Sequence, residues 1–225
     1  MEVTLLMPCL NEEKTIKECI DKSFKFLKNY NIDGEVLVVD NGSTDKSKDI
    51  IKSTKARLIS VEEKGYGSAI INGIKASKGK YIIMYDSDLS YDIDNMYPFI
   101  ENLRKGYDLV MGNRYMGGIS KGSMKLSHII GVKFLTYLGN ILYHTKLGDY
   151  HCGLRAFNKD KFLKLNLECK GMEFASEMII KAKLNNYKIK EIPTKLFVDG
   201  RGHSSHLNTI KDGIRHVVCL LKYKK

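Results

Sequence analysis

Short apolar runs alternate with amphipathic segments through the first half of the chain. Apolar runs that predict β-strands cover residues 3–7, 35–40, 57–61, 81–86 and 108–111. Between them, apolar residues recur every three or four positions in 11–29, 45–55, 65–77 and 94–105, which predicts helices. Strands and helices that alternate at this spacing predict an α/β domain built on a parallel, doubly wound sheet.

Two longer amphipathic segments mark the second half. Residues 121–146 and 207–225 combine apolar side chains with lysines and arginines. Basic amphipathic helices can lie on a membrane surface. Helices that bury one side in a core show the same pattern, so both readings stay open. Residues 112–125 contain four glycines and predict a flexible loop. No repeat or linker divides the chain, and we expect one domain over residues 1–225.

Composition and charge narrow the class of protein. A hydrophobic fraction of 43% over 225 residues excludes a disordered chain and predicts a sizeable core. The net charge of +11 is uneven: residues 1–112 sum to −2 and residues 113–225 to +13. This surplus suggests an anionic partner, which could be nucleic acid, a phosphorylated ligand or an anionic membrane. A solvated basic face would give the same count. Dense basic runs with interleaved aromatic residues are missing, which argues against nucleic acid.

Cysteine spacing and the first residues bear on the compartment. The five cysteines form no Cys-x-x-Cys pair, which argues against a zinc site or a disulfide framework. Residues 1–8 read as a strand and not as a signal peptide. No apolar run reaches the roughly 18 residues that span a bilayer. We therefore expect a cytoplasmic protein.

The strongest chemical motif is a pair of carboxylates at the end of an apolar strand. Asp86 and Asp88 are separated by one residue and follow the run 81–86. Mg²⁺ or Mn²⁺ prefers a few carboxylates together with substrate phosphates, and such an ion can neutralise a diphosphate leaving group. A polar turn after a strand produces the same spacing. The position of the pair in a parallel sheet favours the metal interpretation.

Polar residues also follow other strands of the predicted sheet. Asp40 ends the run 35–40 and can accept hydrogen bonds from a nucleobase or ribose, and Ser43 follows it. Capping of the next helix by Ser43 or Thr44 is an alternative role for that turn. After the first strand, Glu12 can line the same crevice or merely begin a helix. Lys64 and Gly65 can reach a phosphate, although a tight turn explains the glycine equally well.

Candidate anion contacts lie in the second half. Arg114 and Arg155 each lie two residues after a glycine, and arginine binds phosphate through a fork that stays charged. Surface arginines in loops are the alternative. Residues 199–206 form a polar, glycine-bearing loop that could cover a polyanion.

Taken in order, these motifs resemble the family-two inverting glycosyltransferases, most closely the synthases of polyprenyl-phosphate sugars (the dolichyl-phosphate mannose and glucose type). The resemblance runs from Leu6 to about Lys222. Its carriers are MPCLNEE (7–13), VVDNGSTD (38–45), KGYGSAI (64–70), YDSDLSYD (85–92), VMGNRYMGG (110–118), DYHCGLRAF (149–157), GMEFASEM (171–178) and DGRGHSSHLNTIKDGIRH (199–216).

The resemblance implies a Rossmann-like nucleotide-sugar transferase fold (GT-A type) with a mostly parallel central sheet. It implies that residues 1–112 bind the nucleotide sugar and that the basic residues 113–225 face the acceptor and the membrane. Asp86 and Asp88 correspond to the pair that binds Mg²⁺ or Mn²⁺. Catalytic roles fall on Asp86, Asp88, Arg114 and Arg155. The implied nucleotide-sugar contacts are Pro8, Asn11, Glu12, Asp40, Ser43, Lys64, Gly65 and Asp86. The implied acceptor-phosphate contacts are Arg114, Arg155, Arg201, His203 and Ser205, with Glu177 as a further candidate.

Two departures from the family pattern bear on this reading. Some relatives carry Gln two residues beyond the second metal-binding aspartate, where this chain has Ser90. Many relatives continue into transmembrane helices beyond the point that corresponds to Lys222. We therefore expect peripheral contact with the cytoplasmic membrane face, made by the chain itself or through a membrane-anchoring partner.

The leading hypothesis is inverting transfer of a hexose from a nucleotide-diphosphate sugar, of the UDP-glucose or GDP-mannose type, to a polyprenyl (dolichyl or undecaprenyl) phosphate. A second hypothesis keeps the fold but uses a saccharide or lipid-linked saccharide as acceptor. A third is a non-catalytic basic protein that binds anions or membranes, for which Asp86 and Asp88 would be dispensable.

Overall fold

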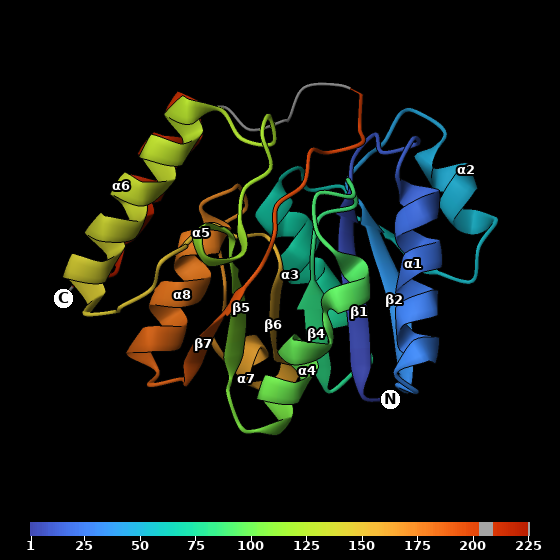
Figure 1. Ribbon diagram of the computed structural model, residues 1–225, viewed down its shortest axis with the longest axis horizontal. Helices are drawn as coiled ribbons and strands as arrows, with labels where there is room; N and C mark the ends of the chain where they lie inside the picture. Colours follow the sequence, from blue (N-terminus) through green and yellow to red (C-terminus); the bar gives the residue numbers. More distant parts are fainter. Residues whose placement is uncertain (203–208, 225) are drawn as a thin grey trace.

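The computed structural model describes residues 1–202 and 209–224, which form an α/β domain around one mixed sheet (Figure 1). In this part of the chain the sheet has seven strands in the order β3-β2-β1-β4-β6-β5-β7. The strands are β1 (Val3–Cys9), β2 (Gly34–Asp40), β3 (Arg57–Ser60), β4 (Tyr81–Met84), β5 (Leu109–Asn113), β6 (Arg155–Asn158) and β7 (Ile189–Pro193). The expected α/β class and mostly parallel sheet are confirmed.

Strand β6 runs against its two neighbours. It pairs antiparallel with β4 on one side and with β5 on the other, whereas the remaining pairs are parallel. In the β4–β6 register Met84 lies opposite Arg155. The first residue of β6 therefore lies at the carboxyl end of β4, where ligands of such sheets bind.

Helices cover both faces of the sheet because the central strands are apolar on both sides. Helices α1 (Ile16–Asn29), η1 (Ile93–Asn95) and α4 (Tyr97–Arg104) pack on one face, and α2 (Ser47–Lys52) lies near α1. Helices α3 (Tyr66–Ala76), α7 (Lys159–Lys164) and α8 (Phe174–Leu184) pack on the other. Alternation along β2 shows the cause: Val36 and Val38 join the first core, Leu37 and Val39 the second.

Several expected boundaries differ from the structure, and three of them concern the loops around the sheet. The helix expected from residue 11 begins at Ile16, because the backbone N–H groups of Asn11 and Glu12 donate to Ser43 and Ser47 and hold 10–15 in a loop. The segment 94–105 divides into η1 and α4, with Pro98 in the first turn of α4. Within 112–125, residues Arg114–Gly117 form the short helix α5 and pack on β7.

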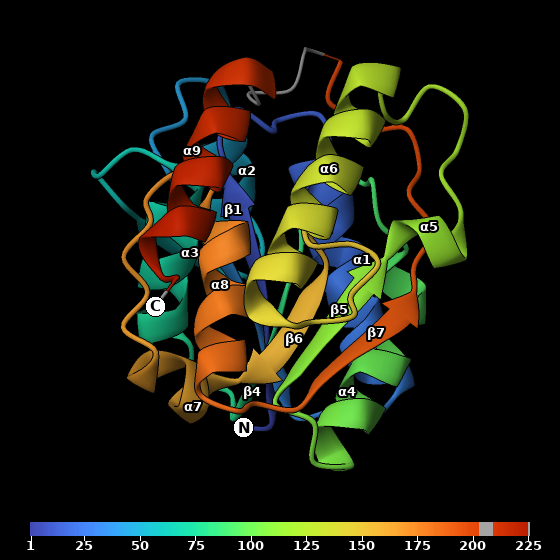
Figure 2. The ribbon, with the colours of Figure 1, turned by 90° about the vertical axis from the view of Figure 1, so that its left-hand side faces the viewer.

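The two basic amphipathic segments form helices α6 (Leu126–Tyr143) and α9 (Thr209–Lys222). They contact each other and α8, and Figure 2 shows them at the same side of the sheet. None of the helices within 1–202 and 209–224 has the length and apolar character needed to cross a bilayer.

Candidate active site

A cavity of about 840 Å³ opens at the carboxyl ends of β1 and β4. Its walls come from the turns after these strands, from the loop before β6, and from α6 and α9. It brings together nine residues implied by the sequence: Pro8, Glu12, Lys64, Gly65, Asp86, Asp88, Arg114, Arg155 and Arg201. The first and second halves of the chain thus share one cavity.

Asp40 lies at the end of β2 and is 1% exposed. Its carboxylate accepts hydrogen bonds from the backbone N–H groups of Gly42 and Ser43, both at 3.1 Å, and Lys48 Nζ lies 3.7 Å away. Asp40 therefore shapes the turn behind the cavity wall, and its contact with a nucleobase or ribose stays a prediction. Capping of α2 by Ser43 or Thr44 is wrong: α2 begins at Ser47, and Ser43 Oγ accepts instead from the N–H of Asn11 at 2.9 Å.

Asn41 ties this turn to the segment that holds Lys64 and Gly65. Its Oδ1 accepts from the N–H of Gly65 at 2.7 Å, and its carbonyl accepts from Lys64 Nζ at 3.0 Å. Gly65 has a φ of 133°, and an added Cβ would lie 2.2 Å from the carbonyl oxygen of Lys170. A glycine is required here by conformation and by close packing.

Asp86 and Asp88 occupy the turn that leaves β4. Asp88 is 3% exposed; its Oδ1 accepts from the N–H of Ser90 at 2.9 Å. Burial raises the pKa of Asp86 to about 6, and the negative charge of Asp88 acts in the same direction. An added Cβ at Gly153 would lie 2.6 Å from Asp86 Oδ2, so this glycine permits the close approach. The carboxylate pair is thus held where a bound cation would offset its repulsion.

The donor set fits a hard divalent cation that is completed by a ligand. Within the described residues no group of three or more His, Cys, Asp or Glu side chains could enclose a metal ion. Mg²⁺ commonly binds through one or two carboxylates with substrate phosphates and water filling the other positions. Asp86 and Asp88 supply two carboxylates and the cavity beside them leaves room for a phosphate.

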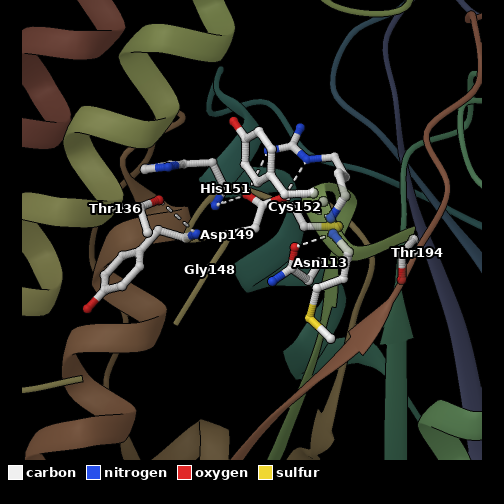
Figure 3. A network of polar contacts seen from close by, with 12 residues as sticks. Asn113, Thr136, Gly148, Asp149, His151, Cys152 and Thr194 are labelled. Carbon is white, nitrogen blue, oxygen red and sulfur yellow. Dashed lines mark hydrogen bonds and ion pairs between the residues drawn. The ribbon is translucent and has the colours of Figure 1, made fainter. Parts of the chain in front are cut away.

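Arg114, the first residue of α5, is held by a buried carboxylate. Its Nε donates to Asp149 Oδ2 at 2.6 Å and its Nη2 to Asp149 Oδ1 at 2.8 Å. Burial opposes the charged form, but these contacts outweigh it and raise the pKa of Arg114. Figure 3 shows Asp149 in a polar network with His151 and Asn113. Asp149 Oδ1 also accepts from the N–H of His151 at 3.1 Å. The pair fixes Arg114 as a permanent cation in the cavity wall.

Arg155 is 1% exposed and is held by backbone carbonyls. Its guanidinium donates to the carbonyl oxygens of Cys152 at 2.8 Å, Ala175 at 2.8 Å and Tyr150 at 2.7 Å. Burial lowers its pKa. These contacts join the loop before β6 to α8, so the structure gives Arg155 a positioning role, and its contact with a phosphate stays a prediction.

Of the remaining candidates, one lines the cavity, one is buried elsewhere and two lie outside the described residues. Arg201 lines the cavity and contacts Asp88, whereas His203 and Ser205 lie outside the described residues. Glu177 is fully buried away from the cavity lining. Its carboxylate accepts from the N–H of Cys169 at 2.8 Å and from Tyr223 Oη at 2.8 Å, so it anchors a loop and the end of α9.

Sequence reasoning missed a histidine pair in the cavity wall. His151 Nε2 lies 3.2 Å from His216 Nδ1, and Ser176 Oγ contacts both rings. Burial lowers the pKa of His216 to about 4, so both rings are held neutral near pH 7. The partners are 65 residues apart in the chain, and no local motif connects them. The sequence motif 149–157 includes Asp149, but nothing in it indicates that Asp149 pairs with Arg114.

Known proteins are similar to this chain in sequence. The chain is 36% identical over 221 residues to the low-salt glycan biosynthesis hexosyltransferase Agl6 of Haloferax volcanii; the match covers 97% of this chain and 53% of that protein, so the chain spans about half its relative's length. It is 26% identical over 242 residues to the dolichol-phosphate mannosyltransferase of Pyrococcus furiosus, covering 100% and 65%.

A solved structure shares the architecture. Glucosyl-3-phosphoglycerate synthase from Mycobacterium tuberculosis, in complex with Mn²⁺, uridine diphosphate and glucosyl-3-phosphoglycerate, superposes with a TM-score of 0.74 at 20% identity, over 99% of this chain and 80% of that one. The expected GT-A-like fold is confirmed by this likeness. The family model described as glycosyl transferase family 2 matches residues 4–165. The resemblance seen in the ordered motifs is therefore confirmed, and the chain belongs to glycosyl transferase family 2.

Proposed function

We propose that the chain transfers a hexose, with inversion, from a nucleotide-diphosphate sugar to a polyprenyl phosphate at the cytoplasmic membrane face, with Mg²⁺ or Mn²⁺ as cofactor. One observation carries the proposal: Asp86 and Asp88 face the same cavity as Arg114 and Arg201. A carboxylate pair suited to a metal-bound diphosphate and arginines suited to a second phosphate are the two halves of such a reaction.

The relatives support both substrates. The Haloferax relative is named a hexosyltransferase and the Pyrococcus relative a dolichol-phosphate mannosyltransferase. The structural neighbour binds Mn²⁺ and uridine diphosphate. In our proposal residues 1–112 hold the nucleotide sugar through Pro8, Glu12, Lys64 and Gly65, and residues 113–225 receive the acceptor. UDP-glucose is the first donor to test.

The chain's own residues would act mainly by position and charge. When bound, the cation would neutralise the diphosphate that leaves the sugar. Asp86 and Asp88 would hold it, and Arg114 would draw the acceptor phosphate towards the sugar. An acceptor phosphate is already anionic, so the transfer does not require a strong general base. Orientation in one cavity supplies the rest of the rate enhancement.

Exposed apolar faces on α6 and α9 support the membrane part of the proposal. Nine large apolar side chains on these helices are more than half exposed: Leu126, Ile130, Phe134, Tyr137, Ile141, Ile210, Ile214, Val218 and Leu221. They recur at helical spacing, and both helices also form walls of the cavity. The net charge of +13 in residues 113–225 favours anionic lipid headgroups. Docking by this face would place the cavity mouth at the membrane, where a polyprenyl phosphate resides.

The test measures release of nucleoside diphosphate from a panel of UDP- and GDP-sugars, with Mn²⁺, Mg²⁺ or EDTA, and with or without a short-chain polyprenyl phosphate. We expect turnover that requires both the cation and the lipid phosphate. Asp88→Ala should lower it by at least about a hundredfold while the circular dichroism spectrum is retained. Asp92→Ala, in the same segment but outside the cavity lining, is the matched control.

Other outcomes redirect the assignment. Turnover only with a saccharide acceptor would favour the second hypothesis, a family-2 transferase that extends a glycan. Wild-type turnover in Asp88→Ala would remove the metal role from this pair. Anion or membrane binding without turnover of any donor would favour the non-catalytic hypothesis.

A further inference from the structure

Arg201 occupies the position beside the carboxylate pair. Its Nη2 lies 2.9 Å from Asp88 Oδ2 and 3.3 Å from Asp199 Oδ2, and its Nη1 lies 3.8 Å from Glu12 Oε1. The side chain of Arg201 is 16% exposed and that of Asp88 is 4% exposed. Burial opposes the charge of the guanidinium, but Asp88 and Asp199 outweigh it and raise the pKa of Arg201. An ion pair in this setting is only weakly screened by solvent.

Both oxygens of Asp88 are engaged. Oδ1 accepts from the N–H of Ser90 at 2.9 Å, and Oδ2 contacts Arg201. A cation held jointly by Asp86 and Asp88 needs an oxygen of Asp88. At either oxygen the cation meets the positive charge of the guanidinium, which lies 2.9 Å from Oδ2. The free energy of that ion pair therefore opposes binding of the metal.

The backbone near Arg201 is held independently of this ion pair. The N–H of Gly200 donates to the carbonyl of Asp88 at 2.9 Å, and the N–H of Phe197 donates to the carbonyl of Ser90 at 2.9 Å. These bonds keep the segment against the turn of Asp88 whichever way the side chain points. Among the described residues, Arg201 Nε is buried and has no hydrogen-bond partner. The carboxylates thus satisfy the guanidinium only in part, and one of its donors stays unused.

We propose that Arg201 is an internal counter-ion of the metal site: it neutralises Asp88 when no cation is bound and is displaced from Asp88 Oδ2 when one binds. A cation and a guanidinium at one carboxylate oxygen repel each other strongly in a partly buried site, so binding of the cation disfavours the contact with Arg201. Displacement turns the fork away from Asp88 while Gly200 keeps its backbone in place. This step deepens the proposed function and rests on its assignment of the cation to Asp86 and Asp88. The displaced fork remains in the cavity, where it can meet the acceptor phosphate.

The test measures Mn²⁺ binding to the full chain without donor or acceptor. The electron paramagnetic resonance signal of free Mn²⁺ gives the bound fraction. Arg201→Gln removes the competing charge, and we expect it to bind Mn²⁺ roughly three- to tenfold more tightly than the wild type. Arg201→Lys keeps a charge but loses the fork and should fall between the two. Thermal melting checks that each variant is folded.

A matched control separates direct competition from general electrostatics. Lys14 lies next to the same segment, since an added Cβ at Gly202 would be 2.5 Å from Lys14 Nζ. Lys14→Gln therefore removes one nearby positive charge without a contact to Asp88, and it should change the Mn²⁺ affinity by less than about twofold. Equal gains in Lys14→Gln and Arg201→Gln would overturn the proposal, as would equal affinities in Arg201→Gln and the wild type.

Failure of this proposal differs from failure of the proposed function. If the wild type turns over donor with Mn²⁺ but Arg201→Gln gains no affinity, only the counter-ion role is lost. If no variant binds Mn²⁺, the counter-ion role is overturned and the metal assignment of Asp86 and Asp88 fails with it. Tighter Mn²⁺ binding in Arg201→Gln without turnover of any donor keeps the counter-ion role and removes the transferase reaction.

Discussion

Arg114 and Asp149 form a two-pronged ion pair in which the carboxylate is fully buried and the guanidinium side chain is 6% exposed. The pair joins the start of α5 to the loop before β6. Glu191 of β7 extends the link, because its carboxylate accepts from the N–H groups of Gly148 and Asp149. Three segments that meet only in the folded protein thus hold one cavity arginine in place.

Breaking this buried pair should lower the free energy of unfolding more than breaking a pair on the surface does. Asp149→Asn leaves Arg114 charged and buried without a counter-charge, and we expect the free energy of unfolding to fall by about 3–5 kcal/mol. Urea denaturation measures it. Lys17→Ala, which removes an exposed i,i+4 pair with Asp21, should change it by less than about 0.5 kcal/mol. Similar losses in the two variants would contradict a special role for the buried pair.

Gly65 should tolerate no side chain. Its φ of 133° and the carbonyl of Lys170 leave no room for a Cβ, so Gly65→Ala should lower the free energy of unfolding by about 1–3 kcal/mol. Gly131→Ala is the matched control: Gly131 lies inside α6 with open space around its Cβ position. At this position alanine should raise the free energy of unfolding by roughly 0.5–1 kcal/mol, because its helix propensity is higher than that of glycine. Thermal melts of both variants test the opposite signs.

The histidine pair should make the protein sensitive to acid. Burial lowers the pKa of His216 from 6.5 to about 4. Above pH 6.5 both the folded and unfolded states are neutral at this residue and it contributes no pH dependence. Between pH 6.5 and 4 the unfolded state binds a proton that the folded state does not, so stability falls as pH falls. The loss levels off below pH 4, at about 3 kcal/mol for this residue.

The measurement is the free energy of unfolding at intervals from pH 7 to 4.5. His216→Asn removes the titrating ring, and its stability should fall less steeply over this window than that of the wild type. His144→Asn replaces an exposed histidine whose left-handed conformation asparagine accepts, and serves as control. If both variants kept the wild-type slope, His216 would not be the origin of the acid sensitivity.

The exposed face of α6 should bind membranes. Phe134→Ser removes a large exposed apolar side chain and should weaken binding to phosphatidylglycerol vesicles by about tenfold, because burial of a phenylalanine contributes roughly 1.5–3 kcal/mol. Co-sedimentation measures the bound fraction. Leu184→Ser removes an exposed apolar residue of α8, outside this face, and should leave binding unchanged. Equal binding by all three proteins would exclude α6 from the membrane contact.

Local patterns predicted the elements of the first half well, because apolar runs and helical periods act over a few residues. The same patterns predict that Asp86 and Asp88 lie at the end of a strand, which the structure confirms for the turn after β4. The antiparallel direction of β6 was beyond such reasoning, since it depends on the pairing of Met84 with Arg155, far apart in the chain. The same holds for the partners of Arg155: a sequence shows an arginine suited to phosphate, but not the three carbonyls that surround it. Glu177 is a similar case: its motif suggests a functional acid, but its carboxylate accepts hydrogen bonds from the loop residues Glu168 and Cys169.

The reversed strand β6 also bears on how the chain folds. Strand β5 has β6 and β7 as its neighbours in the sheet, and both follow it in the sequence. During synthesis β5 therefore has no neighbouring strand to pair with until Arg155–Asn158 has emerged. The strands β1, β2, β3 and β4 can already pair among themselves at that stage. Closure of the β4–β6–β5 contacts joins residues of large sequence separation and is expected to be slow. A chain interrupted before Arg155 would expose the open edge of β4 and a lone apolar β5, which invites aggregation.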